Sequence, residues 1–584
     1  MIPFNRRHFL KTTALATGTT ALWPWSVARA DETAESDFST FSRRRKWVLD
    51  TVTADPLAMR NPYWAAQACF LRGKTELGLQ VWRTAVSREQ HARVRGVELF
   101  NYWPAIHGIA QWGHLMTPAD TEPIKAILTR FREYKDMRTS NLHTLACVTR
   151  YLAGQVFGEK DFAPEAHYRP KDHNAAAGLR ALVEQAAREG FGEWASWPYF
   201  DKNILPVLSI ARLAADPELR QLAQIAFEAG LARNAPYWLH GRWAMPTARS
   251  YPDLLGQKPW GGPQLLWLYF GGTPPDVGEN LVGAAVMDYT PPAAIAIAAG
   301  DRTRPYTVRS RFGQCFQSAY LNRDYGLFSE AQTKVVDRWQ CYPTGVVWND
   351  PAPDRHSFLW VTAPMSDAPS DVSPSHPHGI YNQAQSNLQF EDSLLYVFQF
   401  SRTTKYPYAL GLVPGGHRAF IDDAAKDGRI FLHYSGVLIA ISATAPFHWD
   451  RAAGLRAPSG KPFPGDSEFR IPVSPLALAI ECAHPDEFPG SHPAEKLGVF
   501  RERLHARSRI ELHGPAGRYT NRRGDVLERD FHGPARINGR PEDFATWPAF
   551  TSPWVNQSAP GSLVLNGGGE TITYDFDRRE IRRP

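Results

Sequence analysis

The spacing of the apolar residues changes near residue 300, and this change limits what the chain can fold into. Before residue 300, apolar side chains recur at the period of a helix that buries one face. After it, they stand in short runs separated by Gly, Pro, Asp and Asn, as in antiparallel strands and their turns. Helices first and strands second indicate a multidomain α + β protein.

Residues 40 to about 300 predict at least eight helices with polar, aromatic-rich links. Six of them lie near 62–72, 76–86, 103–115, 120–134, 173–189 and 217–234, and two more follow Asn141 and Tyr199. Proline fits best in the first turn of a helix, so Pro206 predicts a helix start just before it, with Tyr199 in the preceding loop. Successive hairpins of this kind predict an (α/α) toroid over residues 31–305.

The second half predicts a large antiparallel β-sandwich over residues 306–584. Its clearest strand patterns lie at 335–341, 344–348, 394–400, 436–442, 562–565 and 570–574. A small terminal sheet from about residue 510 is left open. The edge strands of such a sandwich need cover, which docking on the helical domain would supply.

The first thirty residues predict a signal peptide. Arg6 and Arg7 form a twin-arginine pattern, a mildly apolar stretch follows, and residues 28–30 make a small-x-small cleavage site. No later stretch offers roughly 18 uninterrupted apolar residues. We therefore expect twin-arginine export, a periplasmic or secreted location and no membrane span.

Charge and motif content exclude several function classes. Four positive charges lie in the signal segment, so the net charge of +6 falls to +2 for the rest, which is too little to indicate nucleic acid or membrane binding. Five widely spaced cysteines give no zinc or disulfide pattern. Phosphate-loop, dinucleotide, His-Glu-x-x-His and Gly-x-Ser-x-Gly motifs are absent from the sequence, so we expect neither a cofactor nor a metal.

Two short segments at predicted helix mouths hold the candidate catalytic residues. The first, residues 139–144, carries Asn141 and His143; the second, residues 190–199, carries Glu193 and Tyr199. His143 and Tyr199 are separated by about one helical hairpin. Because the starts of successive hairpins face the same side of a toroid, we expect these side chains to converge, which suits proton transfer on a sugar.

The chemistry assigns a role to each residue type. Removing a proton beside a carboxylate builds negative charge on that group, and an amide donor or a protonated histidine stabilises this charge. A tyrosine has an ordinary pKa near 10, so a catalytic Tyr199 needs a cationic neighbour. His143, His240, Arg242 and Arg249 are the candidates. Positions 141 and 143 of a regular helix point about 200° apart, so both face a cleft only if Asn141 lies at or before the cap.

The architecture and these segments resemble the toroid-plus-β-sandwich polysaccharide lyases, which include heparinase II/III-like enzymes and related alginate lyases. Residues 190–199 are similar to a Gly-x-x-Glu-x-Ser-x-x-Tyr-like segment of that family, and Asn141 with His143 to its Asn/His pair, although Leu142 separates the two here. The resemblance implies β-elimination in a uronic-acid glycan, with Asn141 or His143 neutralising the carboxylate and Tyr199 moving the proton.

Further residues are candidates for substrate binding. They comprise aromatic residues beside Tyr199, a cationic loop after the helix that ends near residue 233, and histidines of the sandwich that could reach the cleft: Trp194, Trp197, His240, Arg242, Arg249, Tyr251, His356 and His378. A metal at His376 and His378 lacks a third ligand in the sequence. The expected partner is an acidic polysaccharide or oligosaccharide.

Two other functions remain open at this stage. An inverting glycoside hydrolase on the same toroid would use Glu193 as general acid and Asp201 or another carboxylate as base, with the carboxyl groups roughly 6.5–9.5 Å apart. A non-catalytic glycan-binding protein would use the aromatic loops alone. Fold analogy does not separate the three.

Overall fold

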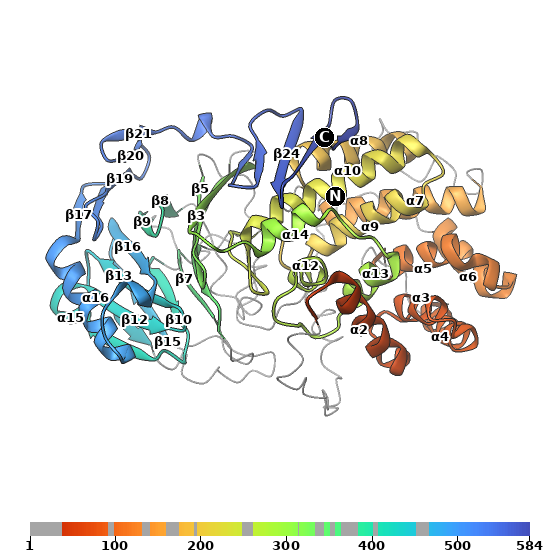
Figure 1. Ribbon diagram of the computed structural model, residues 1–584, viewed down its shortest axis with the longest axis horizontal. Coiled ribbons are helices and arrows are strands. Elements are labelled where there is room, and N and C mark those ends of the chain that lie inside the picture. Colours follow the sequence, from red (N-terminus) through yellow and green to blue (C-terminus); the bar gives the residue numbers. More distant parts are fainter. Residues whose placement is uncertain are drawn as a thin grey trace, which may run out of the picture.

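The computed structural model describes residues 38–90, 99–130, 140–158, 175–191, 196–247, 261–312, 315–332, 344–350, 357–363, 384–400, 407–450 and 467–583. Over these residues a helical lobe is followed by a lobe of strands (Figure 1). The helical lobe ends with α14 (Ala293–Gly300), and the first long strand, β3 (Tyr306–Phe312), follows directly. The predicted α + β fold class is confirmed.

Five helices form a closed inner ring in the first lobe. They are α3 (Pro62–Leu71), α5 (Leu99–Trp112), α7 (Ser140–Phe157), α9 (Phe200–Leu213) and α13 (Glu279–Met287). Each packs on the next, and α13 packs back on α3. Helices α3, α9 and α13 are buried on nearly every side, because a helix inside a ring has neighbours all round. The ring is the predicted toroid.

A second layer of helices covers the ring. Helix α4 (Thr75–Gln90) packs on α3, α6 (Pro118–Arg130) on α5, α8 (Ala175–Glu189) on α7 and α10 (Pro217–Asn234) on α9. Helices α2 (Phe41–Ala54) and α12 (Gly262–Phe270) pack against α13. Helix α4 is amphipathic and buries Val81, Trp82 and Ala85, whereas α12 is buried along nearly its whole length.

The strands form three larger antiparallel sheets and one short hairpin. The hairpin is β1 (Trp238–Leu239) and β2 (Arg242–Trp243). The largest sheet has the order β14-β15-β10-β7-β6-β5-β4-β3-β22-β23-β24-β25-β26. Its further strands are β4 (Cys315–Leu321), β5 (Tyr325–Gln332), β6 (Thr344–Trp348), β7 (Phe358–Thr362), β10 (Ala409–Val413), β14 (His448–Asp450), β15 (Ser467–Ile471), β22 (Phe550–Thr551), β23 (Val555–Gln557), β24 (Ser562–Gly567), β25 (Glu570–Asp575) and β26 (Glu580–Arg582).

The second sheet has the order β11-β12-β13-β16-β9-β8 and packs face to face on the first. Its strands are β8 (Gln385–Phe390), β9 (Ser393–Phe398), β11 (Ala419–Asp423), β12 (Arg429–Tyr434), β13 (Val437–Ala443) and β16 (Leu476–Ala483). Side chains from the two inner faces, among them Leu359 and Ile439, form one buried cluster. This is the predicted β-sandwich.

The outer face of the second sheet is covered by two further elements. Helix α16 (Pro493–Arg507) buries Leu497, Phe500 and Leu504 against β12 and β13. A third sheet runs in the order β17-β18-β19-β20-β21 and packs through Tyr519 and Leu527. Its strands are β17 (Arg509–His513), β18 (Ala516–Thr520), β19 (Val526–Asp530), β20 (Ala535–Ile537) and β21 (Arg540–Glu542), and the short helix α15 (Ala424–Asp427) follows β11.

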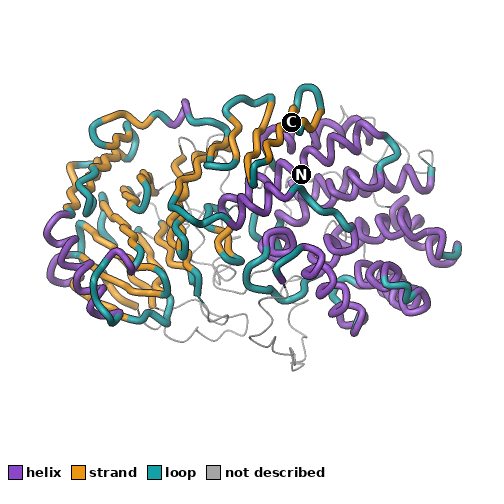
Figure 2. Tube along the Cα trace, in the orientation of Figure 1, coloured by secondary structure: helices purple, strands orange, loops and turns teal. Residues whose placement is uncertain are grey.

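The C-terminal strands β22 to β26 extend the largest sheet over the helical lobe, where β24 lies beside α14 (Figures 1 and 2). The fully buried carboxylate of Glu228 on α10 accepts hydrogen bonds from the hydroxyls of Tyr289 and Tyr574, the latter at 2.8 Å. The guanidinium of Arg233 donates to Gln557 at 2.8 Å. The chain end therefore ties the two lobes together, as the predicted docking requires.

Three local expectations need comment. Pro206 lies inside α9, which begins at Phe200, so the helix starts earlier than its proline predicts and Tyr199 is the N-cap residue. Helix α16 lies in the part predicted to be almost entirely strands. The strand predicted at 335–341 lies outside the described residues.

Among the described residues, no helix combines the length and apolar character needed to cross a membrane.

Candidate active site at the mouth of the helical ring

The N-terminal ends of the five inner helices meet at one end of the ring, which we call the mouth. The Asn61 amide, at the cap of α3, donates to the carbonyl oxygen of Phe100 on α5 at 3.2 Å. The Asn280 amide on α13 donates to the Asp201 carboxylate on α9 at 2.6 Å. The Lys202 ammonium of α9 lies 5.6 Å from the Phe100 ring centroid. Helix starts carry partial positive charge, so the mouth favours anions.

Among the described residues, five asparagines lie at the mouth, one on or directly before each inner helix. They are Asn61, Asn101, Asn141, Asn203 and Asn280. Four of them form hydrogen bonds within the protein. Asn61 donates to Asn101 at 3.2 Å, Asn203 donates to the carbonyl oxygen of Tyr199 at 3.1 Å, and Asn280 donates to the Asp201 carboxylate. The carboxamide oxygen of Asn141 has no hydrogen-bond partner in the described structure, although the residue is only 3% exposed.

An unpaired buried amide atom calls for an explanation, because it costs about 1–3 kcal/mol of stability. The Asn141 amide lies among helix starts whose other asparagines form hydrogen bonds within the protein. Such a group can bind a ligand without first breaking an internal hydrogen bond. Carboxamide oxygen and nitrogen can exchange places by rotation, so the same side chain can offer a donor.

A chain of hydrogen bonds places Tyr199 at the same end of the ring as Asn141. The Thr144 hydroxyl lies 2.8 Å from the carbonyl oxygen of Ser140 and 3.4 Å from the amide oxygen of Asn203. The amide nitrogen of Asn203 donates to the carbonyl oxygen of Tyr199 at 3.1 Å. The starts of α7 and α9 are thereby joined side by side, which brings together the two segments singled out in the sequence.

His143 lies on another side of α7 from Asn141. The helix begins at Ser140, so Asn141 is inside it and the two side chains point about 200° apart. Asn141 shares the buried stripe with Thr144 and Leu145, whereas His143 is partly exposed. The geometry therefore favours Asn141 over His143 as the group nearest the ring axis.

Lys202 and Asp201 are charged residues of the mouth whose arrangement the sequence reasoning missed. Asp201 is 1% exposed, and its carboxylate accepts from Asn280 and from the backbone N–H of Lys202 at 2.8 Å. The Lys202 ammonium lies 6.0 Å from the Tyr199 ring centroid and donates to the carbonyl oxygen of Pro198 at 3.2 Å. The only available sequence signal was a charged pair in the first turn of an inner helix.

Aromatic residues pack the mouth against the β1–β2 hairpin and the start of α12. The Phe200 and Trp243 rings meet edge to face, with centroids 5.2 Å apart. The N–H of Gly262 donates to the carbonyl oxygen of Trp197 at 2.9 Å. A side chain at Gly261 would strike that oxygen, so glycine is required there. The indole N–H groups of Trp197 and Trp243 are buried and have no partner in the described structure.

The predicted cationic loop lies on the strand side of the mouth. His240 is at the tip of the β1–β2 hairpin, and its Nε2 lies 3.0 Å from the carbonyl oxygen of Arg323 in the sandwich. Burial lowers the pKa of Arg242 to about 10, and the Asp350 carboxylate acts in the opposite direction. Arg242 thus keeps its charge beside the sandwich.

Several predicted site residues lie outside the described residues. They are Glu193, Trp194, Arg249, Tyr251, His356 and His378. Their proposed roles stay predictions.

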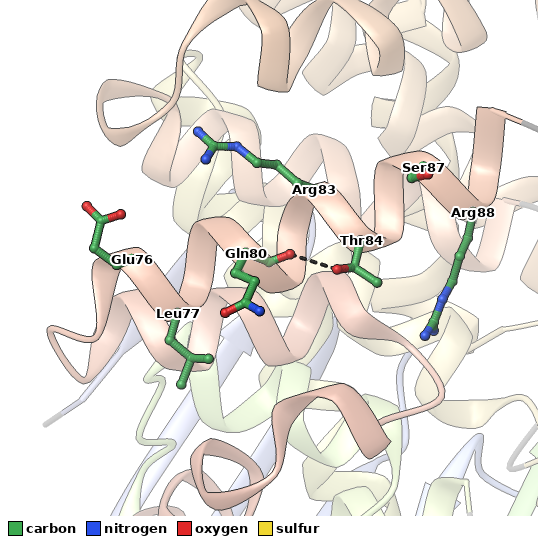
Figure 3. Close-up of a pocket in the computed structure, with 7 residues that line it drawn as sticks. All are labelled: Glu76, Leu77, Gln80, Arg83, Thr84, Ser87 and Arg88. Atoms are coloured by element: carbon green, nitrogen blue, oxygen red, sulfur yellow. Dashed lines mark hydrogen bonds between the residues drawn. The ribbon is translucent and has the colours of Figure 1, made fainter.

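Two other features were considered as sites. A surface depression follows one face of the outer helix α4, between Glu76 and Arg88 (Figure 3). It holds none of the predicted residues. Asp423, Asp427 and His505 lie within metal-ligand distance of one another, but the Arg501 guanidinium already donates to Asp423 at 2.5 Å. This group is an ion-pair cluster.

The comparisons with known proteins give structural matches only. No family model matches the chain, and a search of curated proteins finds no match. Among solved structures, heparinase III is 9% identical, with 84% of this chain and 82% of that chain covered and a TM-score of 0.40. The Streptomyces coelicolor A3 chondroitin AC lyase is 10% identical, with 97% and 91% covered and a TM-score of 0.43. A heparan sulfate lyase from Pedobacter heparinus is 9% identical, with 86% and 82% covered and a TM-score of 0.33. Similarity at this level carries nothing about individual residues.

Proposed function

We propose that the protein is a polysaccharide lyase that cleaves a uronic-acid glycan by β-elimination. The observation that carries the proposal is the unpartnered, buried amide of Asn141 at the mouth. It lies on the helix next to the one that Tyr199 caps, in a place where five helix starts favour a negative charge. This reaction needs an amide to bind the carboxylate and a phenol to move the proton. The partial positive charge of the helix starts favours binding of the carboxylate at the same place.

The reaction proceeds on one uronate residue of the polymer. The phenolic oxygen of Tyr199 removes the proton from C5, the carbon that carries the carboxylate. The electron pair of the C5–H bond forms a double bond between C4 and C5, and the bond from C4 to the glycosidic oxygen breaks. That oxygen leaves with its electron pair and takes up a proton, from Tyr199 or from water. No oxidant or reductant is needed.

The site residues lower the barrier in distinct ways. The Asn141 amide hydrogen-bonds the carboxylate as charge moves onto it, which stabilises the transition state more than the bound substrate. Tyr199 carries the proton. The Trp243 ring is buried and packs edge to face on Phe200, so it supports the start of α9 directly after Tyr199. His143 and Glu193 then act on neighbouring groups rather than on C5.

The hydrolase alternative is less well supported by the described residues. Its suggested base, Asp201, is almost fully buried, and its oxygens already accept from Asn280 and from a backbone N–H. A general base needs an oxygen that can reach a water molecule. With Asp201 engaged, Glu193 would need another carboxylate as its partner.

Ultraviolet absorbance over a panel of polyuronides tests the proposal. The purified mature chain, incubated with each polymer, is expected to release products that absorb because elimination leaves a double bond conjugated to the carboxylate. An active enzyme whose products do not absorb would be a hydrolase. A protein that binds the polymers without shortening them would be a glycan-binding protein. We further propose periplasmic or secreted location through the twin-arginine signal.

A further inference from the structure

Lys202 is a charged side chain of the mouth that the reaction above does not use. It is the third residue of α9 and only 8% exposed, yet its ammonium lies over two aromatic rings from different elements, Phe100 and Tyr199. A buried ammonium is costly unless it is paired. The Lys202 ammonium is paired in this way: it lies 3.6 Å from the Asp201 carboxylate and donates to the carbonyl oxygen of Pro198.

Neutralising Asp201 explains the position of Lys202 only in part. The Asp201 carboxylate is held by the Asn280 amide at 2.6 Å, whereas the Lys202 ammonium stays 3.6 Å away and donates instead to the carbonyl oxygen of Pro198. The ammonium is thus directed toward the Tyr199 side of the mouth, away from the amide that holds Asp201.

The chemistry of β-elimination places a substrate anion beside the same tyrosine. The proton that Tyr199 removes and the carboxylate of the sugar are attached to one carbon atom, C5. The carboxylate of a sugar bound for this reaction therefore lies at the mouth, where the Lys202 ammonium also lies. The ammonium lies 6.0 Å from the centroid of the Tyr199 ring, and over such a distance two charges interact appreciably in a partly buried site.

We propose that Lys202 is a specificity-determining residue that makes the site select an ionised uronate over its methyl ester. The inference rests on the proposed lyase function. It adds the Lys202 ammonium as the group that distinguishes a charged carboxylate from a neutral ester. Asn141 alone can hydrogen-bond the carbonyl oxygen of an acid and of an ester about equally, whereas an ammonium distinguishes them by charge.

The test compares two forms of one polymer. The polyuronide that the wild type cleaves is used as the free acid and after methyl esterification of its carboxyl groups, and kcat/KM is measured for both by ultraviolet absorbance. Both forms can undergo β-elimination. The ratio of kcat/KM for the free acid to kcat/KM for the ester is expected to fall by about 10- to 100-fold in Lys202→Met. This estimate takes a charge–charge interaction over about 6 Å at an effective dielectric constant of about 20.

Two further variants serve as controls. Lys202→Arg keeps the charge and should retain the wild-type ratio within about threefold. Lys125 on α6 also places its ammonium over an aromatic ring, that of Phe157 at 5.8 Å, but on the outer layer, so Lys125→Met should leave the ratio unchanged. If Lys202→Met does not fold, Lys202→Gln supplies the uncharged comparison, with thermal unfolding measured for each variant.

The outcomes separate the inference from the proposed function. A wild type that yields no absorbing product from any polyuronide would overturn the lyase proposal and this inference with it. A wild type that cleaves the acid, together with a Lys202→Met variant whose activities on acid and ester fall equally, would overturn the inference alone. Equal loss on both forms is what a purely structural lysine would give.

Discussion

Replacing the mouth asparagines one at a time should separate stability from activity. Asn280→Ala removes the donor that holds the buried carboxylate of Asp201 at 2.6 Å, and a lost hydrogen bond to a buried charge costs about 2–3 kcal/mol. Asn141→Ala breaks no hydrogen bond of its carboxamide oxygen and removes an unpaired buried atom. Its stability should stay the same or rise by about 1 kcal/mol.

These free energies correspond to small but measurable shifts of the melting temperature. A chain of this size unfolds with an entropy that converts 1 kcal/mol into about 1–2 °C. Asn280→Ala should therefore melt about 2–5 °C below the wild type, and Asn141→Ala within about 1 °C of it or slightly above. In the elimination assay the order reverses: Asn141→Ala should lose about 10²–10³-fold in kcat, because its amide acts once charge develops on the carboxylate.

Calorimetry and ultraviolet kinetics on the same protein samples provide the readout. Asn203→Ala is a second reference, since its amide joins α7 to α9. The reasoning would be refuted by an Asn141→Ala variant that melts as far below the wild type as Asn280→Ala does. It would equally be refuted by full activity of Asn141→Ala on a substrate that the wild type cleaves.

Further outcomes follow from the same picture. Tyr199→Phe keeps the ring and should fold normally while turnover falls about 10²–10⁴-fold; an active variant would exclude Tyr199 as the proton carrier. Glu193→Gln should retain part of the activity in a lyase, and total loss would favour the hydrolase. An ion pair with an arginine of α4 lowers the pKa of Asp120 to about 2, so its stabilisation, on the order of 1 kcal/mol, is present above about pH 4 and lost as the pH falls toward 2. Acid titration of Asp120→Asn should lack that loss. Replacing Arg6 and Arg7 with lysine should retain the precursor in the cytoplasm, and unchanged export would exclude the twin-arginine signal.

The division into helices and strands was predictable because apolar periodicity is a local property of the sequence. The same holds for Asn141 and Tyr199, each of which stands beside a helix start that its neighbours mark. The set of five asparagines was not predictable in this way. Each resembles an ordinary helix cap, and the set forms only when the ring closes through contacts between segments far apart in the chain.

Prolines show how distant contacts override local preference. Pro104 lies inside α5 and cannot donate to the carbonyl oxygen of Phe100, which local reasoning treats as a break in the helix. Asn61 supplies the missing donor from α3 at 3.2 Å. Pro206 likewise lies inside α9, which begins at Phe200, so the start predicted just before Pro206 was too late.

The chemical identity of the reaction products tests the central claim most directly. The mature wild-type protein is incubated with the polyuronide that it shortens, and the released oligosaccharides are examined by mass spectrometry and ultraviolet absorbance. A lyase gives fragments whose new non-reducing end is lighter by one water than the hydrolysis product and absorbs in the ultraviolet, and Tyr199→Phe and Asn141→Ala should both suppress them. Saturated fragments carrying the added water would contradict the account.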